Sequence, residues 1–486
     1  MKLWNAIKKY GIDTIFIIII FYYLANCIKY TIENANFFYI IYIIPLLILY
    51  YIFFKIPDKF LEEKEKWIKI IIIFGSLFIY GTWNAFMRTL PISDYEILVY
   101  GAQEMAKGKI ATLTFDPTNY FYYFNFQIGF ISYLAIIIKL FGTRLVFLKA
   151  TEILIMSISN LLVYIIISKV SSKKTALLSA IVYASLLFNI VGSSIINNQH
   201  ISMLFTLLVI YFYEKKEKKI FSILCGFFLG LSYIFRPSSV IFLIAFFCML
   251  ILNIIRNNFK IKKEGIIQLG MIIITFFAFT RLYDFTMHAL KVVPNSAINI
   301  NAKYYKFVTG LQYKGITGSD TTDAYHTQIY YDIEYYNFDY DKYNKATKEY
   351  ILNRYKNHTK EVLSYFFKEK MPYFTGYPDN QIDFSITEYI NPTLLKMIRD
   401  CGYLQYIGML LLSFFHTILL WKNKKMDEDH RTLYKIVFIG FFLSHFPIEV
   451  QTRYRYDQYL LLCLISIPMM EYLFQKIKFK KWKKER

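Results

Sequence analysis

Cysteine is scarce in this chain: only five occur among 486 residues, and no two of them form a CxxC pair. This scarcity excludes the common thiol-based zinc and redox motifs. The cysteines are far apart, in or at the ends of apolar runs, so we expect small buried side chains rather than disulfides or metal ligands. They are Cys27, Cys225, Cys248, Cys401 and Cys463.

Heptads, low-complexity tracts and a convincing internal repeat are also missing. The first apolar run, residues 12–26, follows a basic start, but no small-residue cleavage site comes after it. We therefore expect a retained helix rather than a signal peptide. Acidic residues are few, 35 against 56 Lys and Arg. Many basic residues fall in short loops and tails between apolar runs, where the positive-inside rule places them, so no nucleic-acid partner is needed.

Long hydrophobic runs are abundant in this chain. Hydrophobic residues make up 56% of the chain and aromatic residues 20%. The apolar runs have about the length, roughly 20 residues, that crosses a hydrocarbon core of about 30 Å. The sequence therefore predicts an all-α polytopic membrane protein.

The basic clusters mark the cytoplasmic ends of the spans and predict about twelve transmembrane helices, with both termini in the cytoplasm. Residues 128–141 form the shortest apolar run and contain Lys139, so we expect an interfacial helix there. The predicted spans are 12–28, 37–55, 67–84, 145–168, 175–194, 200–213, 219–235, 237–255, 265–284, 402–421, 433–448 and 457–475.

Two long segments then lie on the outer face, and loops of that length usually carry function. We expect N-terminal transmembrane helices in 1–84, a first outer loop with interfacial helices in 85–144, and central transmembrane helices in 145–284. A large outer loop domain follows in 285–400, and 401–486 hold the C-terminal transmembrane helices and a basic cytoplasmic tail.

Asp94 and Glu96 stand at the start of the first outer loop, just after a predicted span. A carboxylate at a membrane surface is well placed to accept or give a proton in chemistry on a lipid-borne substrate. Ser93 and Glu96 also have the spacing of a capping box. Gly108 would then end an amphipathic helix whose apolar side faces the membrane with Ile97, Leu98, Ala102 and Met105. The two interpretations are compatible, because a capped helix would hold Asp94 in place.

Several segments resemble the GT-C membrane glycosyltransferases, most closely the protein O-mannosyltransferase and aminoarabinose-transferase type. The first outer loop of that family has an Asp, a helix ending in Gly, an aromatic patch, and a surface helix ending near Phe-Gly. The matching segments here are 94–108, 122–129 and 140–142, followed later by 226–237, 310–312 with Gly318 and Asp320, and Arg453 with Tyr454.

The resemblance implies a GT-C-like fold and transfer of a sugar from a polyprenyl-phosphate donor, with inversion, at the outer face. Asp94 would be the catalytic base. Arg236, Arg453 and Arg455 would bind phosphate oxygens, although each could also simply reach the interface from a span end. The other candidate substrate-binding residues are Glu96, Tyr123, Asn125, Gln127, Asn198, His200 and Gln312.

The sequence departs from the family at two acidic positions, where Asn125 and the stretch 197–200 stand instead. Asp94 would then work alone, or with help from Glu96 or His200, or the chain has lost activity. His200 is otherwise a capping or hydrogen-bonding residue. We expect no metal ligands and no cofactor, with a divalent cation as the alternative, because hard cations need about six oxygen ligands. Asp94, Glu96, Asp320 and Asp323 are the oxygen donors available.

The expected enzyme is thus a hexosyl- or pentosyltransferase of a bacterial cell membrane. Its acceptor would be a cell-envelope glycan, such as a teichoic acid or cell-wall polysaccharide, or a protein hydroxyl. One alternative is a polysaccharide polymerase or ligase that uses diphosphate-linked oligosaccharides. Another is a transporter of lipid-linked sugars, which the missing repeat disfavours.

Overall fold

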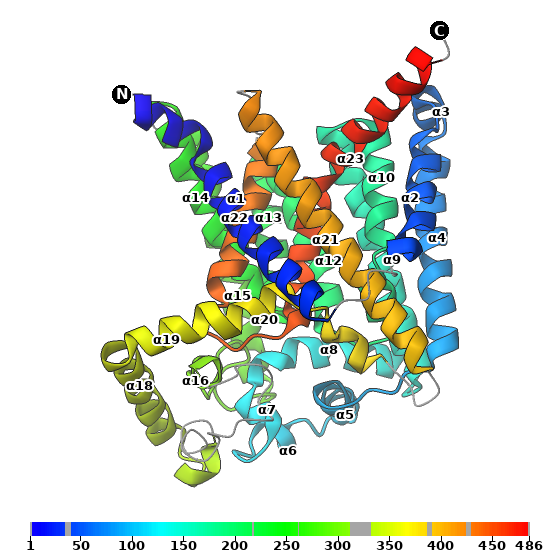
Figure 1. Ribbon diagram of the computed structural model, residues 1–486. Helices are drawn as coiled ribbons and strands as arrows, with labels where there is room; N and C mark the ends of the chain where they lie inside the picture. Colours follow the sequence, from blue (N-terminus) through cyan, green and yellow to red (C-terminus); the bar gives the residue numbers. More distant parts are fainter. Residues whose placement is uncertain are drawn as a thin grey trace.

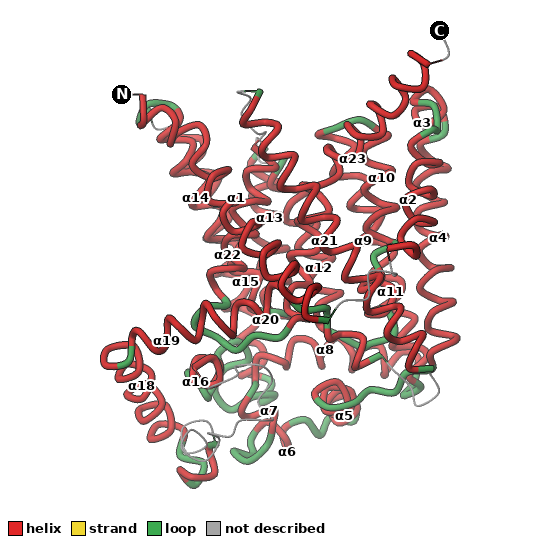
Figure 2. Tube along the Cα trace, in the orientation of Figure 1, coloured by secondary structure: helices red, strands yellow, loops and turns green. Residues whose placement is uncertain are grey.

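The computed structural model describes residues 2–34, 40–215, 218–260, 262–311, 332–385, 391–423 and 429–484. Within these ranges the chain folds into helices joined by turns and loops, with no β-strand (Figure 2). The predicted all-α class is therefore confirmed. As predicted, none of the five cysteines, all of which lie in described parts of the chain, forms a disulfide. Cys27, Cys225 and Cys463 are buried, whereas Cys248 and Cys401 are only partly buried.

Long helices form a bundle in which each predicted span coincides with a helix, the span 175–194 being divided between α10 and α11 (Leu187–Gly192). Among the described residues, seven helices are long and apolar enough to cross a membrane. The bundle comprises α1 (Lys2–Glu33), α2 (Ile40–Phe54), α4 (Glu65–Met87), α9 (Leu145–Val170), α10 (Lys173–Ala184), α12 (Asn198–Tyr213), α13 (Lys219–Phe235), α14 (Val240–Arg256), α15 (Lys263–Ala289), α21 (Pro392–Lys422), α22 (Asp429–Ser444) and α23 (Tyr456–Lys484).

A layer of shorter helices covers one end of the bundle (Figure 1). Helix α1 begins, and helix α23 ends, at the opposite end. The layer contains α5 (Asp94–Ala106), α6 (Ala111–Thr114), α7 (Tyr120–Tyr123), η2 (Asn125–Gln127), α8 (Ile128–Phe141), α16 (Tyr305–Leu311), η4 (Ile333–Tyr336), α18 (Tyr340–Asn357), α19 (Thr359–Tyr365), η5 (Phe366–Lys370), α20 (Met371–Gly376) and η6 (Asn380–Phe384). The remaining short elements are α3 (Asp58–Glu63), η3 (Pro237–Ser239) and η7 (Thr452–Arg455).

Helix α8 lies across the end of the bundle rather than along its axis (Figure 1). Its inner side is fully buried, and Ile128, Ile131 and Leu134 pack in one cluster with residues of α5, α9 and α12. This arrangement agrees with the interfacial helix predicted from the length and charge of the run.

Helix α5 corrects one expectation about orientation. Leu98 and Ala102 were expected to face the membrane, but both are buried in the cluster that α5 shares with α8. The helix ends as predicted, because Gly108 has φ 75° and its backbone N–H donates to Met105 O at 3.0 Å. A left-handed residue of this kind closes a helix most easily when it is glycine.

Candidate functional site

Asp94 is exposed in the first turn of α5. Ser93 occupies the N-cap position, but its side chain makes no capping hydrogen bond, so the predicted capping box is not formed. Ser93 instead has φ 55° and ψ −135°. A residue other than glycine in that region costs on the order of 1–3 kcal/mol and persists only where its surroundings enforce it. The strained residue therefore fixes where Asp94 begins the helix.

Charged side chains from distant parts of the chain lie near the hydroxyl of Tyr95. The Nη1 of Arg453 donates to the Tyr95 hydroxyl at 3.0 Å, although 358 residues separate the two. Asp94, Arg236 and Arg453 all lie close enough to this hydroxyl to act on it electrostatically. The guanidinium of Arg453 also lies 4.1 Å from the centre of the Phe384 ring, a cation–π contact. One carboxylate and two guanidinium groups are thus held around a single phenol.

Arg236 lies between α13 and η3 and rests against the amide of Gln199. With the amide oxygen turned toward the guanidinium, Gln199 accepts a hydrogen bond from Arg236 Nη2 at 3.1 Å. Asp457 is also buried and acts electrostatically on this guanidinium, while its Oδ2 has no hydrogen-bond partner. Arg453, through its bond to Tyr95, is the cation tied directly to the helix that carries Asp94.

A third cation, Lys306 of α16, completes the group. Its ammonium pairs with Glu449 at 2.5 Å, and its backbone oxygen accepts from the Glu449 N–H at 2.9 Å. Lys306 and Asp94 both act electrostatically on the hydroxyl of Tyr305, so both lie in its neighbourhood. Burial raises the pKa of Tyr305 to about 12, and the phenol is neutral at physiological pH.

The Lys306–Glu449 pair predicts an acid-dependent loss of stability. Burial alone would raise the pKa of Glu449, but Lys306 lowers it below the ordinary 4.5. A carboxyl group with a lowered folded-state pKa stabilises the fold above its unfolded-state pKa, and this contribution is lost as the pH falls through the folded-state pKa. We expect the unfolding temperature to fall below about pH 4.5 less steeply in Glu449→Gln than in wild type. Equal slopes in thermal unfolding at pH 7 to 3 would contradict this.

The predicted substrate-binding amides divide into two groups. Gln127 and Asn198 contact each other, with Asn198 Nδ2 donating to Gln127 Oε1 at 3.2 Å, and Gln127 also lies beside Tyr120. Because Asp94 acts on that same tyrosine, these two amides stand near the site. Asn125 is instead buried and donates to the backbone oxygen of Ser296.

Tyr123 is half-buried and His200 is fully buried. The Tyr123 hydroxyl is 3.2 Å from the hydroxyl of Tyr343, within a cluster of tyrosine rings. His200 is 1% exposed, and its Nδ1 is 2.6 Å from Glu152 Oε2. Glu152 was not among the sequence candidates. The structure thus gives His200 a buried carboxylate partner rather than a contact with Asp94.

Arg455 is bound differently from Arg453, although only one residue separates them. Its side chain is fully buried, and it donates to the backbone oxygen atoms of Thr452 at 3.0 Å and Tyr377 at 2.7 Å. Its guanidinium also lies 4.5 Å from the centre of the Tyr406 ring. These contacts join η7 to the segment before η6, so we leave Arg455 out of the proposed site.

The remaining predicted residues are Glu96, Gln312, Asp320 and Asp323. Glu96 is exposed, two residues beyond Asp94. Gln312, Asp320 and Asp323 lie outside the described residues. In the described part of the chain, no three His, Cys, Asp or Glu side chains come together as a metal site. The metal prediction remains a prediction.

Sequence reasoning missed Lys306, Glu449 and the central position of Tyr95. Lys306 sits in a Lys- and Tyr-rich stretch that offers no local signal separating it from its neighbours. Glu449 could have been suspected, because it precedes the Arg453 motif by four residues in a short loop between apolar runs.

A comparison with family models gives a match to part of the chain. The family model of the dolichyl-phosphate-mannose-protein mannosyltransferases matches residues 130–283. This confirms the predicted resemblance over about a third of the chain. The match includes α9 to α14 and Arg236, whereas Asp94, Lys306 and Arg453 lie outside it. A search of curated proteins gives no significant match.

Among solved structures, the chain is similar to an oligosaccharyltransferase of Archaeoglobus fulgidus, tethered to an acceptor peptide that contains the NVT sequon. The TM-score is 0.49 and the sequence identity 13%. The similarity covers 87% of this chain and 51% of that protein, so this chain spans about half its length.

Proposed function

We propose that the protein is an inverting GT-C glycosyltransferase that moves a hexosyl or pentosyl group from a polyprenyl-phosphate donor to a cell-envelope glycan or protein acceptor. The observation that carries the proposal is the convergence of Asp94 with Arg236, Arg453 and Lys306 around Tyr95 and Tyr305. The family match over residues 130–283 supports the reaction class.

The arrangement suits a single displacement. The acceptor hydroxyl attacks the anomeric carbon while Asp94 takes its proton. The bond between that carbon and the phosphate oxygen breaks, and polyprenyl phosphate leaves with the electron pair and an added negative charge. Arg453, Arg236 and Lys306 would stabilise this charge, as fixed cations do most effectively where water is excluded. One displacement inverts the anomeric configuration.

We place the site on the outer face of the cell membrane and both termini in the cytoplasm. The first and last helices have their free ends at the end of the bundle opposite the layer with Asp94 (Figure 1). The basic residues around Lys173 and Lys219 stand at the starts of α10 and α13, as the positive-inside rule requires of cytoplasmic loops.

The proposal predicts a specific lipid phenotype. In cells that lack the protein, we expect a polyprenyl-monophosphate sugar to accumulate, and to return to normal when wild-type protein is supplied. Mass spectrometry of extracted membrane lipids measures both states and identifies the sugar. Accumulation of diphosphate-linked oligosaccharide would indicate a polymerase or ligase instead. Unchanged lipid-linked sugars would reject the transferase.

A further inference from the structure

Two lysine side chains meet at the end of the bundle opposite the layer that carries Asp94. Helices α9 and α12 both begin beside α8, since Leu148 and Ile201, near their starts, pack in the same cluster as α8. Lys169, in the last turn of α9, and Lys215, just after α12, therefore lie toward the far end of the bundle. The proposed topology makes this end cytoplasmic.

One tyrosine ring holds both ammonium groups. Lys169 Nζ lies 3.4 Å from the centre of the Tyr211 ring, and Lys215 Nζ lies 4.5 Å from it. Lys215 Nζ also donates to the Tyr211 hydroxyl at 2.9 Å. An aromatic ring attracts cations through its negative face, so one ring can bring two like charges close together. The two ammonium groups act on each other electrostatically, and an anion bound by both would relieve their repulsion.

No carboxylate of the described chain pairs with these two lysines. Lys169 and Lys215 form no ion pair with any residue that the structure describes, residues 216 and 217 being outside it. The carboxylate next in sequence, Glu214, instead accepts from the Tyr434 hydroxyl at 3.1 Å. Two positive charges are thus gathered at one place without an internal counter-ion.

Other lysines at the same end of the bundle are neutralised within the chain. Lys173 pairs with Glu65 at 2.9 Å, and Lys174 pairs with Asp58 at 3.3 Å. These two belong to the start of α10 and provide an internal comparison, because their charge is the same and only their partners differ.

An apolar surface adjoins the lysine pair. Lys215 Nζ lies 5.3 Å from the centre of the Phe221 ring in the first turn of α13. Phe221 stacks on Phe212 of α12, with ring centres 5.8 Å apart. Ile220 and Ile223, close to Phe221 in sequence, are 54% and 41% exposed. A ligand at this place therefore meets cations and, beside them, a surface suited to hydrocarbon.

We propose that Lys169, Lys215 and Tyr211 bind the phosphate of an anionic phospholipid, whose acyl chains lie against the start of α13. Each ammonium group would donate a charge-assisted hydrogen bond to a phosphate oxygen, and the Tyr211 hydroxyl would donate another. A soluble phosphate would gain the same bonds but no contact with Ile220 and Ile223, so the lipid is favoured. This site is separate from the transferase site, and neither proposal depends on the other.

Native mass spectrometry of the full chain, freed of lipid in detergent, tests the site. The anionic probe is dioleoyl phosphatidylglycerol, and the probe without net charge is dioleoyl phosphatidylcholine. A lysine near the membrane surface contributes about fivefold to the affinity for anionic lipid. We therefore expect wild type to bind its first phosphatidylglycerol about 25-fold more tightly than phosphatidylcholine. The double variant Lys169→Gln, Lys215→Gln should lose this preference.

Two further variants separate a built site from diffuse charge. Lys173→Gln with Lys174→Gln removes the same charge from the same end of the bundle, and it should keep the affinity for phosphatidylglycerol within about twofold, because those lysines are already paired. Tyr211→Leu keeps both lysines of the site but removes the ring that holds them, and it should weaken binding about fivefold. Thermal unfolding establishes that each variant is folded.

Four results would overturn the proposal. The first is equal binding of the two lipids by wild type, and the second is an unchanged preference in the folded variant without Lys169 and Lys215. Equal losses in the Lys173 and Lys174 variant would show diffuse surface charge in place of a site. Displacement of phosphatidylglycerol by an equal concentration of inorganic phosphate would assign the lysines to a soluble anion.

Discussion

Replacing Asp94 with asparagine is expected to lower sugar transfer by about 10²- to 10⁴-fold, the range that a positioned general base contributes. Asparagine keeps the size and shape of the side chain but cannot take a proton from the attacking hydroxyl. Asp94 is exposed at the start of α5, so the substitution should leave the fold unchanged. The measurement is release of polyprenyl phosphate by the purified protein, given lipid-linked sugar and envelope extract.

The matched control for this experiment is Glu104→Gln. Glu104 is an acidic residue of the same helix, nearly three turns beyond Asp94, and it pairs with Lys107 at 2.7 Å. We expect this variant to transfer sugar at the wild-type rate. If Asp94→Asn is also as active as wild type, then Asp94 only begins a helix and the general-base assignment is wrong.

Substituting the two arginines of η7 should affect different properties: Arg455→Met the stability of the fold, and Arg453→Met the rate of sugar transfer. Arg455→Met leaves the backbone oxygen atoms of Thr452 and Tyr377 without their donor in a buried place. At about 1–3 kcal/mol for each unsatisfied group, and with the ring contact to Tyr406 lost, we expect several kcal/mol of destabilisation, about 3–6 kcal/mol. Such a loss is comparable to the total stability of many proteins. Thermal unfolding and the yield of monodisperse protein measure it.

Arg453→Met should instead remain folded and lose turnover. Its guanidinium bonds the Tyr95 hydroxyl and stacks on Phe384, and neither contact leaves a buried backbone group without a partner. Loss of one charge-assisted hydrogen bond to phosphate, about 1.5–3 kcal/mol, corresponds to a decrease in kcat/KM of about 10- to 100-fold. If both variants fold equally well and lose transfer equally, Arg455 belongs to the substrate site and our division between the two residues is wrong.

The sequence by itself determined the helices and the class of protein. A membrane helix satisfies its backbone hydrogen bonds within its own segment, so the length and apolarity of a run are enough to predict it. The same local logic predicted an interfacial helix at residues 128–141 and a helix end at Gly108. In the structure α8 lies across the end of the bundle and Gly108 ends α5. It failed at Ser93, where spacing predicted a capping side chain and the structure has a strained backbone instead.

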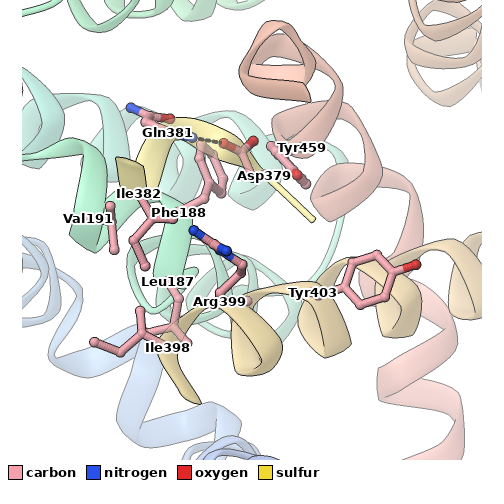
Figure 3. Close-up of a pocket in the computed structure, with 11 residues that line it drawn as sticks. Leu187, Phe188, Val191, Asp379, Gln381, Ile382, Ile398, Arg399, Tyr403 and Tyr459 are labelled. Carbon is pink, nitrogen blue, oxygen red and sulfur yellow. Dashed lines mark hydrogen bonds between the residues drawn. The ribbon is translucent and has the colours of Figure 1, made fainter. Parts of the chain in front are cut away.

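Only the tertiary structure decided which polar residues meet. The Tyr95–Arg453 bond joins residues 358 positions apart, and the Lys306–Glu449 bond residues 143 apart. The pocket drawn in Figure 3 likewise forms only where α11, η6, α21 and α23 pack together. Arg453 and Arg455 share one motif, yet packing turns one toward Tyr95 and the other into backbone oxygen atoms. Side-chain direction at such places depends on how distant helices pack, and this is not encoded in the spacing of neighbouring residues.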